Sequence, residues 1–305
     1  MAMIAITGGT GFVGRHLIRM GIGRGHHIRA LTRRDQPPAP HLDWISGALD
    51  RPDSLARLVE GADAVIHVAG VINAASRHGF AAGNIAGTEA MIAAAEGAGV
   101  RRFIHVSSLA AREPGLSDYG WSKLRSEELL KHGGGRSLDW TIIRPPAVYG
   151  PGDREMLELF RMARRGFVAL PPAGRFSVIA AEDLCRLLLD LIDAPASHGH
   201  SYEPDDGTIE GWDHRDFALA LGQAIGRRVR PLSMPARLLH AASFADGLVR
   251  RGRAKLTRDR VRYFCHPDWV STHAARPPAS LWRAEIATPD GLKATADWYR
   301  REGWL

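Results

Sequence analysis

The chain has 305 residues, of which 45% are hydrophobic and 24% are charged, and it carries a net charge of +7. This length and composition are typical of a globular protein with a well-buried core, in one large domain or two unequal ones. The arginines are scattered along the chain, which argues against a nucleic-acid-binding protein.

Signals for secretion, membrane insertion and metal binding are missing. No run of about 18 apolar residues predicts a membrane-spanning helix, and the opening MAMIAITGG lacks the regions of a signal peptide. Cys185 and Cys265 are too few for a disulfide framework and fit a reducing compartment. The histidines show no paired metal spacing. We therefore expect a cytoplasmic protein with no metal and no integral membrane segment.

Short apolar runs alternate with helical patterns through the first half of the chain. Strands are expected at 3–7, 27–31, 64–69, 102–107 and 140–145, and helices at 12–20, 53–60, 84–97 and 119–132. This alternation predicts a parallel sheet covered on both faces. We expect an α/β fold with a Rossmann-type doubly wound parallel sheet at 1–150, returning segments near 176–195, and a smaller C-terminal lobe formed mainly by 151–305.

The sequence ITGGTGFVGRHL follows the first strand and opens the first helix. Gly8, Gly11 and Gly14 fit one dinucleotide-binding spacing, and Gly9 with the last two fits another. Glycines let the backbone approach a pyrophosphate, whose charge the helix N-terminus favours. Arg15 follows where a nucleoside-triphosphate loop needs lysine, so such a loop is excluded. A tight turn without a ligand is the alternative.

The end of the second strand favours one cofactor over the other. Thr32 stands at the strand end, where NAD-binding proteins carry an acid for the ribose hydroxyl, and Arg33 and Arg34 follow it. A guanidinium can bind a 2′-phosphate through two hydrogen bonds. We therefore predict NADP rather than NAD, although a loop shift that brings Asp35 to the ribose would reverse the preference.

Tyr119 and Lys123 lie four residues apart at the start of an expected helix, so they share one face. A neighbouring ammonium and an oxidised nicotinamide favour the phenolate, so such a pair can exchange a proton near neutral pH. The preceding strand ends in Ser107 and Ser108, at the edge where ligands bind in such sheets. Either serine can orient a substrate oxygen, because neighbouring strand residues face opposite ways.

These features together resemble an extended short-chain dehydrogenase/reductase, of the superfamily that includes nucleotide-sugar epimerases and dehydratases. The resemblance runs through TGGTGFVG (7–14), VIHVAG (65–70), NIAGTEAM (84–91), VSS (106–108), YGWSK (119–123), RPPAVYGPGD (144–153), FSVIAAEDL (176–184) and GLKATADWYRREGWL (291–305). It implies a catalytic set of Ser108, Tyr119 and Lys123 and a substrate-binding role for the C-terminal lobe. Together with the residues at the end of the second strand, the resemblance implies a cofactor-binding set of Gly8, Thr10, Gly11, Phe12, Val13, Gly14, Thr32, Arg33, Leu49, Ala69, Gly70, Lys123, Pro145 and Val148.

The chain also departs from this superfamily. Ser108 and Tyr119 are closer in sequence than in most of its epimerases and dehydratases, so we expect residues 109–118 to influence substrate choice. Ala48 stands where an Asp usually lies beside the adenine. In LAAREPGL (109–116), directly after the serines, only Glu113 is acidic, which makes dehydratase chemistry less expected.

The leading hypothesis is an NADP-dependent enzyme that moves a hydride between nicotinamide and a carbonyl or secondary alcohol of a small molecule. One alternative is a nucleotide-sugar epimerase with tightly bound NAD(P). Another is a non-catalytic NADPH-binding accessory protein. The resemblance also makes a homodimer plausible. The basic segment 250–262 is expected to be a solvated face, although an anionic substrate, an acidic partner or a membrane surface can also account for it.

Overall fold

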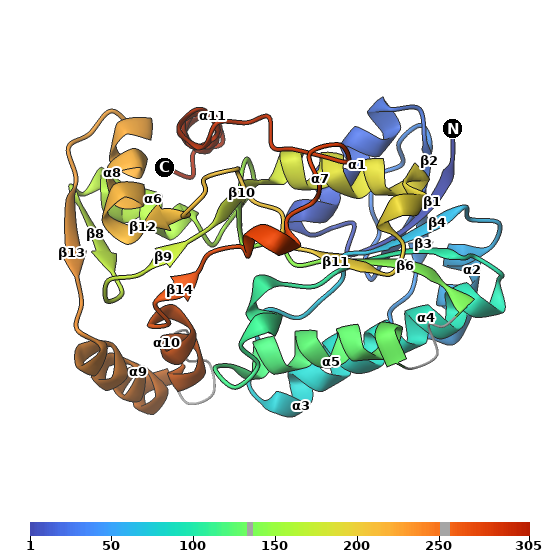
Figure 1. Cartoon of the computed structure of the whole chain (residues 1–305), viewed down its shortest axis with the longest axis horizontal. Helices are drawn as coiled ribbons and strands as arrows, with labels where there is room; N and C mark the ends of the chain where they lie inside the picture. The colour runs from blue at the N-terminus through green and yellow to red at the C-terminus, as the bar shows by residue number, and fades with distance from the viewer. Residues whose placement is uncertain (133–136, 251–256) are drawn as a thin grey trace. The chain divides into compact units, whose positions relative to one another are not determined.

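The computed structural model describes the backbone of residues 1–132, 137–250 and 257–305. The chain forms two compact units (Figure 1). The first unit comprises residues 1–144, 184–203 and 277–282, and the second comprises residues 145–183, 204–276 and 283–305. Within the described ranges, no helix combines the length and the apolar character needed to cross a bilayer.

The first unit contains a seven-stranded sheet with the order β11-β6-β5-β4-β1-β2-β3, in which all neighbours are parallel. Its strands are β1 (Met3–Thr7), β2 (His27–Thr32), β3 (Leu42–Ser46), β4 (Ala64–His67), β5 (Arg102–Val106), β6 (Asp139–Ile143) and β11 (His200–Tyr202). Five of these strands were expected from the sequence. The edge strands β3 and β11 were not.

Helices cover both faces of this sheet. They are α1 (Phe12–Gly23), α2 (Pro52–Val59), α3 (Arg77–Phe80), α4 (Gly87–Gly97), α5 (Asp118–His132) and the part of α7 (Ala181–Asp190) that belongs to this unit. Figure 1 shows α2, α4 and α5 along one face and α1 and α7 along the other. The doubly wound parallel architecture predicted from the sequence is therefore confirmed.

A hydrophobic core joins the sheet to α2, α4 and α5. Ala5, Val65, Phe103 and Ile142 point from four adjacent strands into this layer and are completely buried. The helices contribute Leu55, Leu58, Met91, Ile92 and Leu130. Because strand side chains alternate between the two faces, the near-continuous apolar runs are explained by burial of both faces.

The second unit is built from short strands and irregularly spaced helices. Its strands are β7 (Ala147–Tyr149), β8 (Phe167–Leu170), β9 (Arg175–Phe176), β10 (Val178–Ala180), β12 (Trp212–Asp213), β13 (Arg230–Ser233) and β14 (Asp268–Trp269). Its helices are α6 (Leu157–Arg164), α8 (His214–Ala224), α9 (Ala236–Arg250), α10 (Arg258–Phe264) and α11 (Thr288–Arg301). Phe160, Leu221, Leu292 and Tyr299 lie at the centre of its own hydrophobic core.

Candidate active site

The candidate site lies at the carboxyl edge of the parallel sheet in the first unit. Strands β1, β4 and β5 end there at Thr7, His67 and Val106, and the parallel pairing brings these ends together. The glycine loop follows β1, residues 69–71 follow β4, and the two serines follow β5. Ligands of open α/β sheets bind at this edge.

The glycine loop is built for close approach of a ligand. Gly8 has a φ of +75°, and a Cβ on it would lie 2.8 Å from the backbone nitrogen of Ala69. A Cβ on Gly14 would overlap the carbonyl oxygen of Gly8. Gly11 donates its N–H to that same oxygen at 2.9 Å and caps α1, whose first turn holds no acidic residue. Helix starts leave N–H groups available, so the loop fits the pyrophosphate of a dinucleotide.

The end of β2 presents an arginine to solvent. The buried Thr32 hydroxyl donates to the carbonyl oxygen of Arg34 at 2.6 Å and accepts the Arg34 N–H at 3.2 Å. This tight turn leaves the Arg33 side chain exposed directly after the strand. Asp35, two residues after Arg33 in the sequence, is also exposed.

The Ser108 hydroxyl lies close to the phenol of Tyr119 and acts on its pKa. Ser108 is held at the start of the 3-10 helix η2 (Leu109–Arg112), where its Oγ accepts the N–H of Ala110 at 3.2 Å. Tyr119 lies in the first turn of α5, which starts there because the Ser117 hydroxyl accepts the Gly120 N–H at 2.9 Å. Burial raises the pKa of Tyr119, and the Ser108 hydroxyl acts in the opposite direction.

Lys123 lies one turn further along α5 and is only 3% exposed. Its Nζ donates to the carbonyl oxygen of Val106 at 2.8 Å. Burial lowers the pKa of Lys123 to about 8, against the opposing effect of Glu127. A Cβ on Gly70 would lie 3.6 Å from this Nζ, so the ammonium sits beside the backbone that follows β4. A Lys with this pKa can exchange protons near neutral pH.

Ser107 points into a different network. Its hydroxyl donates to Oε1 of the fully buried Glu127 at 2.6 Å. Arg144 binds both oxygens of the same carboxylate, at 2.9 and 2.7 Å. Although burial opposes ionisation of Glu127, the Arg144 guanidinium holds its pKa below the usual value. The structure therefore brings Ser108, and not Ser107, to Tyr119.

The short segment between Ser108 and Tyr119 packs inward. Leu109, Ala110 and Ala111 are at most 2% exposed. The close contact of Gly120 with the Ala110 carbonyl holds η2 against the start of α5. This segment therefore fixes the position of Tyr119 relative to Ser108.

Asn84 is a site residue that the sequence reading did not single out. It lies in the π-helical segment η1 (Ala81–Ala86), a form that is frequent at functional sites. Its Oδ1 accepts the N–H of Val71 at 2.6 Å, and its Nδ2 donates to the Val71 carbonyl at 3.0 Å and to Ser122 Oγ at 2.8 Å. A buried Asn in an otherwise apolar helical stretch was the signal available in the sequence.

A directed chain of hydrogen bonds connects the ends of β1 and β4 to Asn84. The Thr88 hydroxyl donates its one proton to the Asn84 carbonyl, so it must accept from Nε2 of His67. His67 therefore accepts at Nδ1 the proton of Thr7, whose oxygen accepts the N–H of Ala69. This chain joins the ends of β1 and β4 to η1 and keeps His67 neutral.

His105 lies beside His67 under the same edge. Its Nε2 bonds to Ser126 Oγ at 3.0 Å, and Ser126 donates its proton to the Lys123 carbonyl, so Nε2 carries the hydrogen. Nδ1 of His105 finds no hydrogen-bond partner in the described part of the chain. Burial, then the charge of Lys123, hold the pKa of His105 well below its ordinary value.

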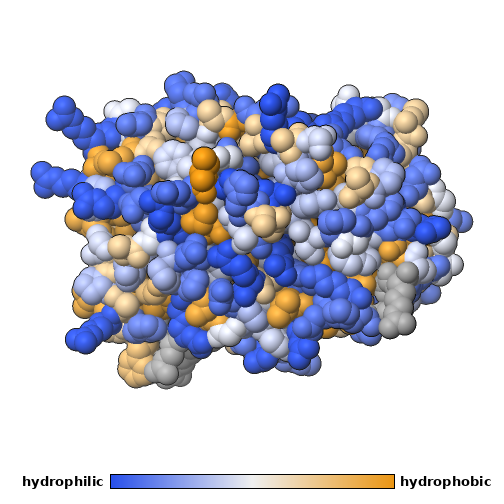
Figure 2. Space-filling model, viewed as in Figure 1, coloured by the Kyte–Doolittle hydropathy of each residue, from blue (hydrophilic) through white to orange (hydrophobic). Residues whose placement is uncertain are grey.

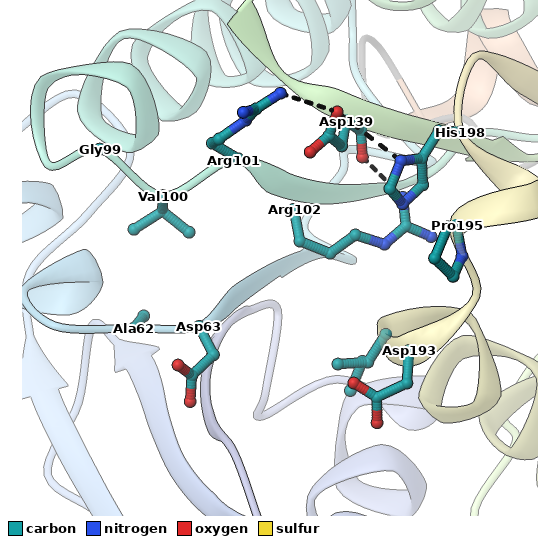
Figure 3. A pocket seen from close by; sticks show the side chains of 11 residues that line it. Ala62, Asp63, Gly99, Val100, Arg101, Arg102, Asp139, Asp193, Pro195 and His198 are labelled. Carbon is teal, nitrogen blue, oxygen red and sulfur yellow. Dashed lines mark hydrogen bonds and ion pairs between the residues drawn. The ribbon is translucent and has the colours of Figure 1, made fainter.

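A cavity of about 550 Å³ lies at the opposite, amino edge of the sheet (Figure 3). Arg101 and His198 both point toward the Asp139 carboxylate, at 3.3 and 3.6 Å. Arg102 is buried and donates to the carbonyl oxygens of Leu191 and Asp139. These contacts tie the chain after α7 to the sheet, and none of the predicted site residues lines this cavity.

The remaining predicted cofactor residues are divided between the units. Leu49 packs against Gly87 of α4 in the first unit, where a Cβ on the glycine would lie 2.7 Å from Leu49 Cδ1. Thr10 accepts a hydrogen bond from Arg15 through its carbonyl oxygen. Pro145 and Val148 belong to the second unit, in which Pro145 is buried and Val148 is half-buried in β7. Their predicted cofactor roles stay predictions.

Comparison with known proteins gives matches along most of the chain. Residues 4–203 match the model of the NAD dependent epimerase/dehydratase family. The ceramide reductase of Caulobacter vibrioides is 36% identical over 99% of this chain and 96% of its own length. The 2-alkyl-3-oxoalkanoate reductase of Stenotrophomonas maltophilia is 28% identical over 95% and 97%. Among solved structures, gox2253 superposes with a TM-score of 0.79 at 21% identity, covering 100% of this chain and 99% of its own.

Proposed function

Because the chain belongs to the NAD-dependent epimerase/dehydratase family and is an oxidoreductase of the extended short-chain dehydrogenase/reductase type, we propose that it uses NADPH to reduce a ketone on a substrate with a long acyl or alkyl chain. The product is the secondary alcohol. The observation that carries the reaction type is the Ser108 hydroxyl close to the phenol of Tyr119, with the buried Lys123 one turn away.

In this proposal Tyr119 donates the proton that the ketone oxygen needs, and the bound dinucleotide supplies the hydride to the carbon. Ser108 donates a hydrogen bond to the same oxygen, which orients it and stabilises its developing negative charge. Lys123 keeps a positive charge near the tyrosine, which favours the phenolate left after proton transfer. Asn84 holds the backbone of Val71 beside these groups.

Two features support the choice of NADPH. The residue at the end of β2 is Thr32 and not an Asp or Glu, whose carboxylate would repel a 2′-phosphate. The Thr32 hydroxyl forms hydrogen bonds with the Arg34 backbone. The exposed guanidinium of Arg33 follows directly and can bind a phosphate.

The substrate class is proposed from the relatives. Two full-length relatives, a ceramide reductase and a 2-alkyl-3-oxoalkanoate reductase, are named as reductases of molecules with long or alkyl chains. The identity of 36% over nearly the whole chain favours a ceramide-type lipid over a nucleotide sugar.

The test is a turnover measurement with NADPH and three substrates: a keto form of a ceramide, a 2-alkyl-3-oxoalkanoate and a UDP-sugar. We expect NADPH oxidation with at least one of the two ketones. Tyr119→Phe should lower that turnover by about 100-fold or more, because it removes the proton donor, with NADPH affinity nearly unchanged. Tyr263→Phe, in the second unit, is the matched control and should keep full turnover.

Two outcomes would overturn the proposal. Interconversion of UDP-sugars without net NADPH oxidation, together with no ketone reduction, would identify an epimerase. NADPH binding without turnover of any carbonyl compound, in protein that copurifies with a large partner, would identify an accessory protein.

A further inference from the structure

Helix α9 turns a broad apolar face to solvent. Leu238 is 53% exposed and Phe244 is 61% exposed, and the three alanines of the same stretch, at 241, 242 and 245, are exposed as well. At about 100° per residue these positions span about 160° of the helix surface, an arc that also contains the exposed Arg237, while Ser243 is buried on the opposite side. Between 236 and 246 the exposed polar side chains are only Arg237 and His240.

Exposed hydrophobic side chains also lie on the elements that precede and follow α9 in the sequence. The described residues include eight exposed large hydrophobic side chains, and four of these lie between 232 and 264. Besides Leu238 and Phe244, they are Leu232 of β13, which is 48% exposed, and Phe264 of α10, which is 42% exposed. The guanidinium of Arg260 lies 5.9 Å from the centre of the Phe264 ring. Helix α10 packs against α9. We call Leu232, Leu238, Phe244, Phe264 and the three alanines the α9 surface.

Figure 2 shows a small group of tan, weakly hydrophobic atoms beside blue ones at the lower left, near the place of α9 in Figure 1. Exposed apolar patches of this kind on a globular protein mark interaction sites.

Positive charge is dense along the sequence segment that contains α9. Residues 227–262 contain eleven Lys or Arg and two Asp, a net charge of +9, whereas the whole chain carries +7. The rest of the chain therefore carries a net charge of −2, because acidic residues offset its arginines. The sequence-based expectation of a solvated basic face over 250–262 falls partly on residues 251–256, which lie outside the described residues.

We propose that the α9 surface binds the surface of an anionic lipid bilayer. An amphipathic helix with an apolar face and basic flanks lies in the headgroup region, with its apolar side chains among the acyl chains. Each nearby Lys or Arg adds attraction to anionic headgroups. A nucleic acid would use the charge but would leave Leu238 and Phe244 unburied, so the apolar centre favours lipid.

The experiment measures flotation of the full-length protein with vesicles, without substrate, so its result does not depend on the reaction proposed above. One vesicle type is phosphatidylcholine alone, and the other contains one-third phosphatidylglycerol. We expect binding to the anionic vesicles, weak binding to the neutral ones, and loss of binding as salt is raised.

The decisive variant is the double change Leu238→Ser and Phe244→Ser. Because it removes two apolar side chains from the acyl region, the binding constant should fall about 10-fold or more. Ile209→Ser is the matched control, since Ile209 is 77% exposed elsewhere in the same unit, and it should bind as the unchanged protein does. Thermal melts should coincide for all three proteins, because the altered side chains are exposed.

Several results would overturn the proposal. They are equal binding to neutral and anionic vesicles, equal binding by the double variant, or no binding at low salt. Tighter binding to a DNA duplex than to anionic vesicles would assign the surface to nucleic acid. A dimer that the double variant dissociates, without any vesicle binding, would assign it to self-association. Should the double variant fail to fold, the lipid and salt dependence of the unchanged protein still decides between these results.

Discussion

The imidazole rings of His67 and His105 stack inside the first unit, with their centroids 5.5 Å apart and their planes 17° from parallel. Burial, then the charge of Lys123, lower the pKa of His67 to about 3 from 6.5 and hold that of His105 well below 6.5. Both rings are therefore neutral in the folded protein under conditions in which they bind protons in the unfolded chain. Their contribution to stability is complete above pH 6.5 and is lost as the pH falls below it.

We expect the free energy of unfolding to fall as the pH is lowered from about 6.5 toward about 3, the window between the ordinary histidine pKa and the lowered pKa of His67. Each histidine should contribute a slope of up to about 1.4 kcal/mol per pH unit. Urea unfolding at several pH values measures this slope. His105→Phe should lower this slope by up to about 1.4 kcal/mol per pH unit, which corresponds to one proton. An unchanged slope in that variant would show that His105 is not neutral in the folded protein.

Ser107 and Ser108 should respond differently to removal of their hydroxyls. Ser108→Ala should lower kcat by about 10-fold or more, because the substrate oxygen loses a donor, and should lower stability by about 1 kcal/mol, because the Ala110 N–H loses its acceptor. Ser107→Ala should keep most of kcat but lower stability by about 1 kcal/mol, because it removes a hydrogen bond to the buried Glu127. Turnover and thermal unfolding of the two variants check this pair, and a larger kcat loss in Ser107→Ala would reverse the roles.

Lys123 should be a residue that costs stability. Burial lowers its pKa from 10.5 to about 8, so at neutral pH the folded state holds this charge less favourably than the unfolded chain. Lys123→Met should therefore raise the free energy of unfolding at pH 7 by about 2 kcal/mol, while turnover falls sharply. Thermal or urea unfolding tests the first part, and a less stable variant would contradict it.

Arg33 should determine cofactor preference. Arg33→Ala should raise the KM for NADPH about 10-fold or more, because a charge-assisted bond to the 2′-phosphate is lost, and should leave the KM for NADH nearly unchanged. Arg34→Ala is the control, since Arg34 is also exposed but uses its backbone in the turn with Thr32. Equal effects of the two variants on both cofactors would argue against a specific phosphate contact.

Much of the fold was predictable because its central strands are buried on both faces. Strands such as β1 and β5 consist mostly of apolar or β-branched residues and stood out for that reason. Strand β3 has the sequence LDWIS with mixed exposure at the sheet edge, and β11 has only three residues. Such short or half-exposed strands form through pairing with a neighbour, which the local sequence does not record.

The site was predictable where its geometry is local. Tyr119 and Lys123 share a helix face by their spacing alone. The sequence did not reveal the roles of His67 and Asn84, because their partners are distant in the chain. Thr7 bonds to His67 across 60 residues, and Ser122 bonds to Asn84 across 38. The choice between the two serines likewise depended on Glu127, which is 20 residues beyond Ser107.

The hydrogen-bond chain from Ala69 through Thr7, His67 and Thr88 to Asn84 also bears on local opening of the protein. Because each proton in it has one acceptor, the end of β1 cannot separate without breaking the links at β4 and η1. Amide hydrogens in these three places should therefore exchange with solvent deuterium together, as one cooperative unit. The loop that fits the dinucleotide and the helix that presents Asn84 would then be protected, or lost, at the same time.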